Sequence, residues 1–222
     1  MKLKRLFAAV LSTALALSLC AMPAMATEGG TTAGTPLADG MPVWDTTQKG
    51  SITIHKFEYN PSSGAPSQQG TGAEGEAAPP GAKPLGGVTF EIYKVQNEEW
   101  LKAYYGGQAA ATGQDFSNID ASNYYSTNST TGAITVNGSK IDTVTTATSG
   151  TDIGVAKKDG LALGLYLVVE TSAPDKVTSP AAPFLVSVPM TRIADTTTTN
   201  KLTDWIYDVH VYPKNSTTYG QV

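Results

Sequence analysis

A lysine stands directly after a proline that closes a run of alternating apolar residues. Because proline has no backbone N–H and fixes its own φ, the strand is predicted to end at Pro213 and to hold Lys214 out from a rigid strand end. The chemistry open to such an amine is nucleophilic attack on an acyl group. At pH 7 a lysine with a pKa of about 10.4 lies roughly 4.6 kcal/mol from its neutral form, so a docked enzyme has to supply a desolvated pocket and a base.

A second lysine, Lys56, is predicted to point into the interior, because it alternates with Ile52 and Ile54 on one face of a strand. A buried lysine needs a partner, since an isolated charge in an apolar interior is costly. His55 and His210 are the only histidines, and neither a metal cluster nor a catalytic triad can be assembled from them. The sequence therefore predicts neither a metal site nor a catalytic triad, and no cofactor is expected.

The chain begins with a predicted secretory signal peptide, residues 1–26. Three basic residues precede an apolar stretch from Leu6 to Ala21, which is shorter than the roughly 20 residues of a membrane-spanning helix. Cys20, the only cysteine, lies inside this stretch, so the exported chain has neither a disulfide nor a cysteine nucleophile. The exported chain retains 12 basic and 19 acidic residues, a net charge of −7 that makes nucleic acid and anionic lipid poor partners.

The rest of the chain is predicted to form one domain, residues 44–215, between two polar ends. Residues 27–43 lack apolar periodicity and are predicted to be a flexible linker, and residues 216–222 to be the start of another. Within the domain, residues 60–84 are rich in Gly, Ala, Pro, Ser and Gln. We expect this tract to be a flexible loop on the surface between two strands.

Strand patterns dominate the domain, and turn residues separate them. They cover residues 51–59, 87–95, 133–137, 154–158, 165–171, 183–189 and 205–212. One short helix, residues 97–105, is predicted to cover a sheet edge. The absence of βα alternation predicts an all-β antiparallel sandwich. In the last strand, period two directs Trp205, Tyr207, Val209 and Val211 to the core and Asp208, His210 and Tyr212 outward.

The C-terminal stretch resembles the pilin motif W-x-x-x-V-x-V-Y-P-K of Gram-positive major pilins. The specified positions are filled by Trp205, Val209, Val211, Tyr212, Pro213 and Lys214. In that family a class C sortase joins this lysine to the threonine of the sorting signal on the next subunit. The resemblance implies that Lys214 forms the intermolecular isopeptide linkage. It also implies that the chain is a structural pilus subunit and a sortase substrate, not an enzyme.

A second stretch, residues 164–174, resembles the E-box of the same family, with Glu170 as its glutamate. In collagen-adhesin B-type domains a buried glutamate promotes an amide bond between a first-strand lysine and a last-strand asparagine, with loss of ammonia. Lys56 is the matching lysine, but Pro213 takes the asparagine slot of the pattern V-x-V-x-N. Asn215 lies two residues further on and is expected to serve only if the strand shifts or bulges. A plain buried contact between Lys56 and Glu170 is therefore expected in preference to the crosslink.

The resemblance implies an immunoglobulin-like, collagen-adhesin B-type sandwich. It also implies further domains and a sorting signal beyond Val222, so we expect the chain to be the N-terminal part of a longer subunit. Its partners are then neighbouring pilin subunits and a class C sortase, and its location is a secreted, cell-surface pilus that is anchored in the cell wall as a polymer.

An adhesive module is the alternative from another functional class. Such a module recognises a host protein or glycan through loops that the sandwich only supports. Four tyrosines could furnish the binding surface: Tyr104, Tyr105, Tyr124 and Tyr125. Ligand binding that persists when Lys214 is changed to alanine would favour this alternative.

Overall fold

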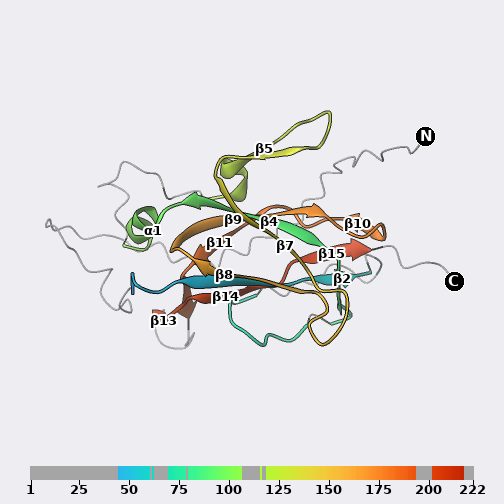
Figure 1. Ribbon diagram of the computed structural model, residues 1–222, viewed down its shortest axis with the longest axis horizontal. Helices are drawn as coiled ribbons and strands as arrows, with labels where there is room; N and C mark the ends of the chain where they lie inside the picture. The colour runs from blue at the N-terminus through green and yellow to red at the C-terminus, as the bar shows by residue number, and fades with distance from the viewer. Residues whose placement is uncertain are drawn as a thin grey trace, which may run out of the picture.

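The computed structural model describes residues 45–217 except 61, 63–69, 79, 107–115, 117–118 and 194–201. The predicted signal peptide, most of the predicted linker ends and part of the tract 60–84 lie outside these residues. Strands predominate in the described part (Figure 1). No helix among the described residues has the length and apolar character needed to cross a membrane.

Seven strands form the first layer, as two sheets joined end to end: β1 (Gly50–His55), β2 (Phe57–Tyr59), β3 (Lys83–Pro84), β8 (Val155–Leu161), β10 (Val177–Ser179), β14 (Asp208–Val211) and β15 (Lys214–Thr217). The strand orders are β14-β1-β8 and β10-β15-β2-β3. The sheets are continuous because β2 follows β1 after the single residue Lys56, and β15 follows β14 after residues 212–213.

Four antiparallel strands form the second layer: β4 (Thr89–Gln96), β7 (Ser139–Thr145), β9 (Gly164–Ser172) and β11 (Phe184–Val188). Their order is β11-β9-β4-β7. The nearly continuous apolar run of β9 fits its position in this sheet, because both of its faces are covered. Val168 faces the first layer, whereas Leu167 faces away from it.

The main core lies between the two layers. Ile52 and Ile54 from β1 and Val209 and Val211 from β14 form one cluster with Phe90 and its neighbours from the second layer. The chain is therefore an all-β sandwich of the immunoglobulin-like kind, as the sequence predicted. One feature differs from the prediction of a purely antiparallel fold: β1 pairs with β14, and β2 with β15, in the parallel sense.

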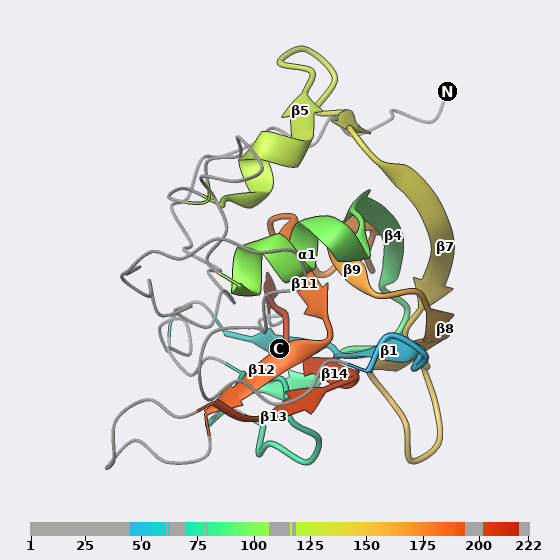
Figure 2. The same cartoon turned by 90° about the vertical axis from the view of Figure 1, so that its left-hand side faces the viewer.

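The predicted helix is α1 (Glu98–Tyr105), and it begins where Asn97 accepts a hydrogen bond from the backbone N–H of Trp100 at 2.9 Å. Trp100 and Leu101 pack against the outward-facing residues of β9 and β11. The expectation that the helix covers a sheet edge is therefore wrong. It covers the outer face of the second layer and builds a second apolar cluster there (Figure 2).

Two hairpins complete the described structure. One joins β12 (Met190–Ile193) to β13 (Leu202–Ile206), and the other joins β5 (Tyr125–Thr127) to β6 (Ile134–Val136), after the 3₁₀ helix η2 (Ala121–Tyr124). The β5–β6 hairpin stands away from the two layers in both views (Figures 1 and 2). The predicted single strand 205–212 is in fact split between β13 and β14 at Tyr207.

Candidate functional site

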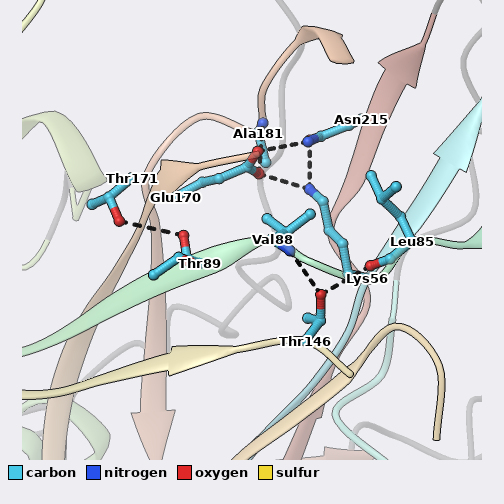
Figure 3. A network of polar contacts seen from close by, with 9 residues as sticks. All are labelled: Lys56, Leu85, Val88, Thr89, Thr146, Glu170, Thr171, Ala181 and Asn215. Atoms are coloured by element: carbon cyan, nitrogen blue, oxygen red, sulfur yellow. Dashed lines mark hydrogen bonds and ion pairs between the residues drawn. The ribbon is translucent and has the colours of Figure 1, made fainter. Parts of the chain in front are cut away.

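The structure brings three polar side chains together inside the sandwich. Lys56 lies between β1 and β2, Glu170 lies near the end of β9, and Asn215 lies in β15 (Figure 3). Lys56 and Asn215 are fully buried, and the Glu170 side chain is 1% exposed. Three chain segments far apart in sequence therefore meet at one site that water does not reach.

The three side chains form a closed ring of hydrogen bonds. The Lys56 amine donates to Glu170 Oε2 at 2.8 Å and to Asn215 Oδ1 at 2.5 Å. The Asn215 amide donates to the other carboxylate oxygen of Glu170 at 2.6 Å. The backbone N–H of Ala181 adds a bond to Glu170 Oε2 at 3.2 Å. The predicted contact between Lys56 and Glu170 is thus present, and Asn215 joins it.

Burial changes the acid–base properties of the cluster. Desolvation lowers the pKa of Lys56 to about 8, although the adjacent Glu170 carboxylate opposes this shift. The positive charge of Lys214 lowers the pKa of Lys56 further. The amine also lies over the ring of Phe90, 5.5 Å from the ring centroid. A neutral, nucleophilic amine is therefore more accessible here than on an exposed lysine.

The prediction that Asn215 could join this site only through a shifted or bulged strand is wrong. The pairs Ile54–Val211 and Phe57–Lys214 keep one parallel register on both sides of the break between β14 and β15. Period-two alternation therefore carries the core face from Val211 on to Asn215. The long lysine side chain spans the extra distance along the strand.

Lys214 is the second candidate residue, and its position differs from the prediction. Pro213 does not end the ladder, because its carbonyl oxygen accepts a hydrogen bond from the N–H of Phe57 at 3.0 Å. The chain then continues as β15, and Lys214 is its first residue, paired with Phe57. Lys214 is thus half-buried at a strand start rather than held out from a strand end.

The surroundings of Lys214 affect its amine in two opposite ways. Burial lowers the pKa of Lys214, whereas the negative charge of Glu76 raises it. Glu76 belongs to the tract 60–84, which was expected to be a flexible surface loop. Residues 70–78 of that tract lie over β14, where the Gly72 oxygen accepts a hydrogen bond from the backbone N–H of His210 at 3.0 Å.

His210 was predicted to face outward, and it does lie on that face, but it is only 5% exposed. Residues 70–78 cover this face, and their composition gave no sign of it. Tyr212 is half-buried there too, and its hydroxyl donates to the Ala73 oxygen at 2.8 Å. Sequence reasoning therefore missed Glu76 and its neighbours, because only tertiary contacts bring them beside Lys214.

The remaining predicted residues are buried or pack against one of the two apolar clusters. Val209 and Val211 lie in the main core, with Tyr207 packed against it. Trp205 is buried, but it lies in β13, where its ring meets that of Tyr105 edge to face at 4.8 Å. The four tyrosines of the adhesive alternative pack against the second cluster: Tyr104, Tyr105, Tyr124 and Tyr125.

No group of three or more His, Cys, Asp or Glu side chains suited to a metal ion occurs among the described residues. The two reactive centres of this part of the chain are thus an internal lysine–carboxylate–amide cluster and a half-buried lysine beside it in sequence. The first centre holds an amine, a carboxylate and an amide in contact, and the second holds an amine, so both contain groups that amide chemistry uses.

Comparison with known proteins identifies relatives over most of the domain. The family model for the Gram-positive pilin subunit D1, N-terminal domain, matches residues 47–216. Fimbrial subunit type 1 of Actinomyces viscosus is 33% identical over 166 residues, which are 75% of this chain and 26% of that protein. Fimbrial subunit type 2 of Actinomyces naeslundii is 31% identical over 175 residues, covering 75% of this chain and 29% of that protein.

Among solved structures, the full-length major pilin SpaD from Corynebacterium diphtheriae is 31% identical, with a TM-score of 0.47. The match covers 79% of this chain and 34% of that pilin. The chain therefore spans between a quarter and a third of the length of the curated relatives that it matches.

Proposed function

The chain belongs to the family of Gram-positive pilin subunit D1 N-terminal domains, and on this premise we propose that it is a structural subunit of a covalently polymerised bacterial surface pilus. In this proposal Lys214 is the residue that accepts the next subunit. A class C sortase delivers the threonine acyl group of that subunit's sorting signal. The neighbouring pilin subunits and the sortase are then the partners, and the cell-wall-anchored surface pilus is the location.

The position of Lys214 carries the proposal. Lys214 closes the complete pilin motif and begins β15 on the face that turns away from the main core. Its half-burial lowers the pKa of the amine, which reduces the cost of forming the neutral nucleophile. The amine is thereby partly prepared for attack before any enzyme docks.

The linking step makes one amide bond. The neutral Lys214 amine attacks the acyl carbon of the threonine bound to the sortase, and the bond from that carbon to the enzyme breaks. The electron pair of this bond leaves with the enzyme's nucleophile, and the amine loses a proton to a base in the docked enzyme. The chain contributes a substrate side chain and does not turn over, so it is not an enzyme in this scheme.

We also propose that Lys56 and Asn215 become joined inside the domain. The Lys56 amine already touches the Asn215 carbonyl oxygen and so lies beside the carbon that it would attack. Glu170 contacts both groups and can pass a proton from the lysine nitrogen to the departing amide nitrogen. The products are an amide bond and one ammonia, and the event occurs once per chain.

The adhesive alternative finds less support among the described residues. The tyrosines that could form its binding surface are engaged in the second apolar cluster instead. These contacts leave less of the four rings available to a host ligand, and Lys214 has no role in such a module.

A sortase reaction tests the proposed linkage. The mature chain, which lacks the predicted signal peptide (residues 1–26), is incubated with a class C sortase and a peptide that carries a sorting signal. The joined product is measured by intact mass. Product is expected from the unchanged chain and not from Lys214→Arg. Lys140→Arg serves as the matched control, because Lys140 is an exposed lysine on β7. Equal yields from the unchanged chain and Lys214→Arg would contradict the proposal.

A further inference from the structure

The parallel strand pair carries a row of rings on its outer face, opposite the Lys56 cluster. The row runs from His210 in β14 through His55 in β1 and Tyr212 to Phe57 in β2. Phe57 is level with Lys214 in the strand pairing. The row therefore ends at Phe57, the residue that pairs with Lys214, the proposed linking residue. Of the four rings, only that of Tyr212 fills a specified position of the pilin motif.

His55 occupies the middle of this row. Its ring stacks on Tyr212 with centroids 4.8 Å apart and planes 11° from parallel, and on His210 at 5.1 Å and 21°. Tyr212 also stacks on Phe57 at 6.5 Å and 14°. Since stacked rings within about 7 Å attract one another beyond simple burial, His55 supports the orientation of Tyr212 from one side.

His55 is itself held in place by an anchored neighbour. Its Nε2 lies 2.8 Å from Nδ1 of His210, so one of these nitrogens donates a hydrogen bond to the other. His210 is fixed in turn, because its side chain is buried and its backbone N–H donates to the Gly72 oxygen at 3.0 Å. The imidazole of His55 thus presents a fixed surface to Tyr212.

Tyr212 connects this ring stack to Lys214, which follows it by two residues in the chain. Tyr212 and Pro213 lie between β14 and β15, and the register on either side places Tyr212 on the same outer face as Lys214. The Tyr212 hydroxyl donates to the Ala73 oxygen at 2.8 Å and accepts from the Glu76 N–H at 3.3 Å. The stack and these two bonds together fix the ring two residues before Lys214.

We infer that His55 is a positioning residue for the linking reaction: its ring, held by His210, sets the orientation of Tyr212 and through it the direction of the Lys214 side chain. This inference rests on the proposed role of Lys214. His55 touches no reacting atom and acts through Tyr212. An amine misplaced by about 1 Å can cost up to roughly a hundredfold in rate, so the effect is measurable.

The test measures kcat and KM for the acceptor chain in the sortase reaction, well below the lowest unfolding temperature of the variants. For His55→Ala, we expect kcat to fall about tenfold or more, with a smaller change in KM. His55→Phe keeps a ring in the stack and is expected to recover most of the rate. Tyr125→Ala removes a ring from β5 and is expected to react as the unchanged chain does.

The variants His55→Gln and Lys214→Arg make the result of this test unambiguous. If His55→Ala fails to fold, His55→Gln takes its place, because glutamine retains a hydrogen-bonding group without a ring and is also expected to be slow. An unchanged kcat in a folded His55→Ala or His55→Gln chain would overturn the inference, as would a His55→Phe chain as slow as these. Failure of the proposed function can be told apart from failure of this inference. If Lys214 is not the linking residue, the Lys214→Arg chain is still joined to the peptide.

Discussion

Asn215 and Lys214 are neighbours in β15, yet they belong to opposite faces of the strand. Asn215 is fully buried and bonded to Lys56 and Glu170, whereas Lys214 is half-buried on the face that carries Tyr212 and Phe57. Alternation along one strand therefore separates the two proposed linkage sites by a single peptide bond. In the proposed scheme each lysine has its own acyl partner, and it could not take the partner of the other without leaving its face of the strand.

The intact mass of the mature chain tests the internal amide. We expect the unchanged chain to weigh one ammonia less than its sequence requires, because Lys56 displaces the amide nitrogen of Asn215. Asn215→Ala lacks the acyl group, and Glu170→Gln lacks the proton carrier, so both are expected at full mass. Asn128→Ala, in an exposed turn, is the matched control and is expected to show the loss. A folded, unchanged chain that keeps its full mass would exclude the crosslink.

The same amide is expected to stabilise the domain. Lys56 and Asn215 are 159 residues apart, so a bond between them closes nearly the whole described domain into one loop. The chain-entropy argument used for disulfides gives about 5 kcal/mol for a loop of this length. Guanidinium unfolding of the unchanged chain and of Asn215→Ala measures the difference, and Asn128→Ala controls for loss of an asparagine. Equal unfolding midpoints would show that the bond adds no stability.

The pH dependence of unfolding reports on Lys56 when no crosslink can form. In Asn215→Ala the unfolded chain holds the lysine proton up to a pH of about 10.5, whereas the folded chain gives it up near 8. The unfolded state then binds more protons between these values, so the free energy of unfolding rises with pH, by up to about 3 kcal/mol.

Two comparisons isolate this effect from other titrating groups. The double variant Lys56→Met/Asn215→Ala is expected to lose the extra slope, because it has no amine at this site. The crosslinked, unchanged chain should lose it as well, since an amide does not titrate. A slope that persists in the double variant would assign it to another residue.

Much of the fold followed from period-two alternation. It placed Ile52, Ile54 and Lys56 on one buried face, and the structure confirms this. The same rule extended past Pro213 places Asn215 in the core, whereas the proline itself predicts the end of a strand. The proline carbonyl still accepts a hydrogen bond from Phe57, and β15 resumes the same register at Lys214, so the loss of one N–H interrupts the strand without changing its register.

The surroundings of Lys214 could not be predicted in the same way. His210 is covered, and Glu76 approaches Lys214, only because residues 70–78 fold back over β14. Their composition is that of a flexible loop, and contacts between segments more than a hundred residues apart leave no periodic signal. The helix was predictable from the helical spacing of its apolar residues, but the face that it covers was not.

The second apolar cluster offers a test of the fold itself. Leu101 in α1 is fully buried against β9 and β11, so Leu101→Ala is expected to cost about 2–5 kcal/mol of unfolding free energy. Lys102→Ala, at the next position of the same helix, is partly exposed and is expected to cost about 0.5 kcal/mol or less. Similar losses for the two variants would mean that α1 does not pack on the sheet as described.

A peptide map of the sortase product, read by tandem mass spectrometry, tests the separate fates of the two lysines most directly. We expect one branched peptide in which the threonine of the sorting signal is attached to Lys214, and another in which Lys56 is attached to Asn215. Attachment of the sorting-signal threonine to Lys56 or to any other lysine, with Lys214 unmodified, would contradict the account.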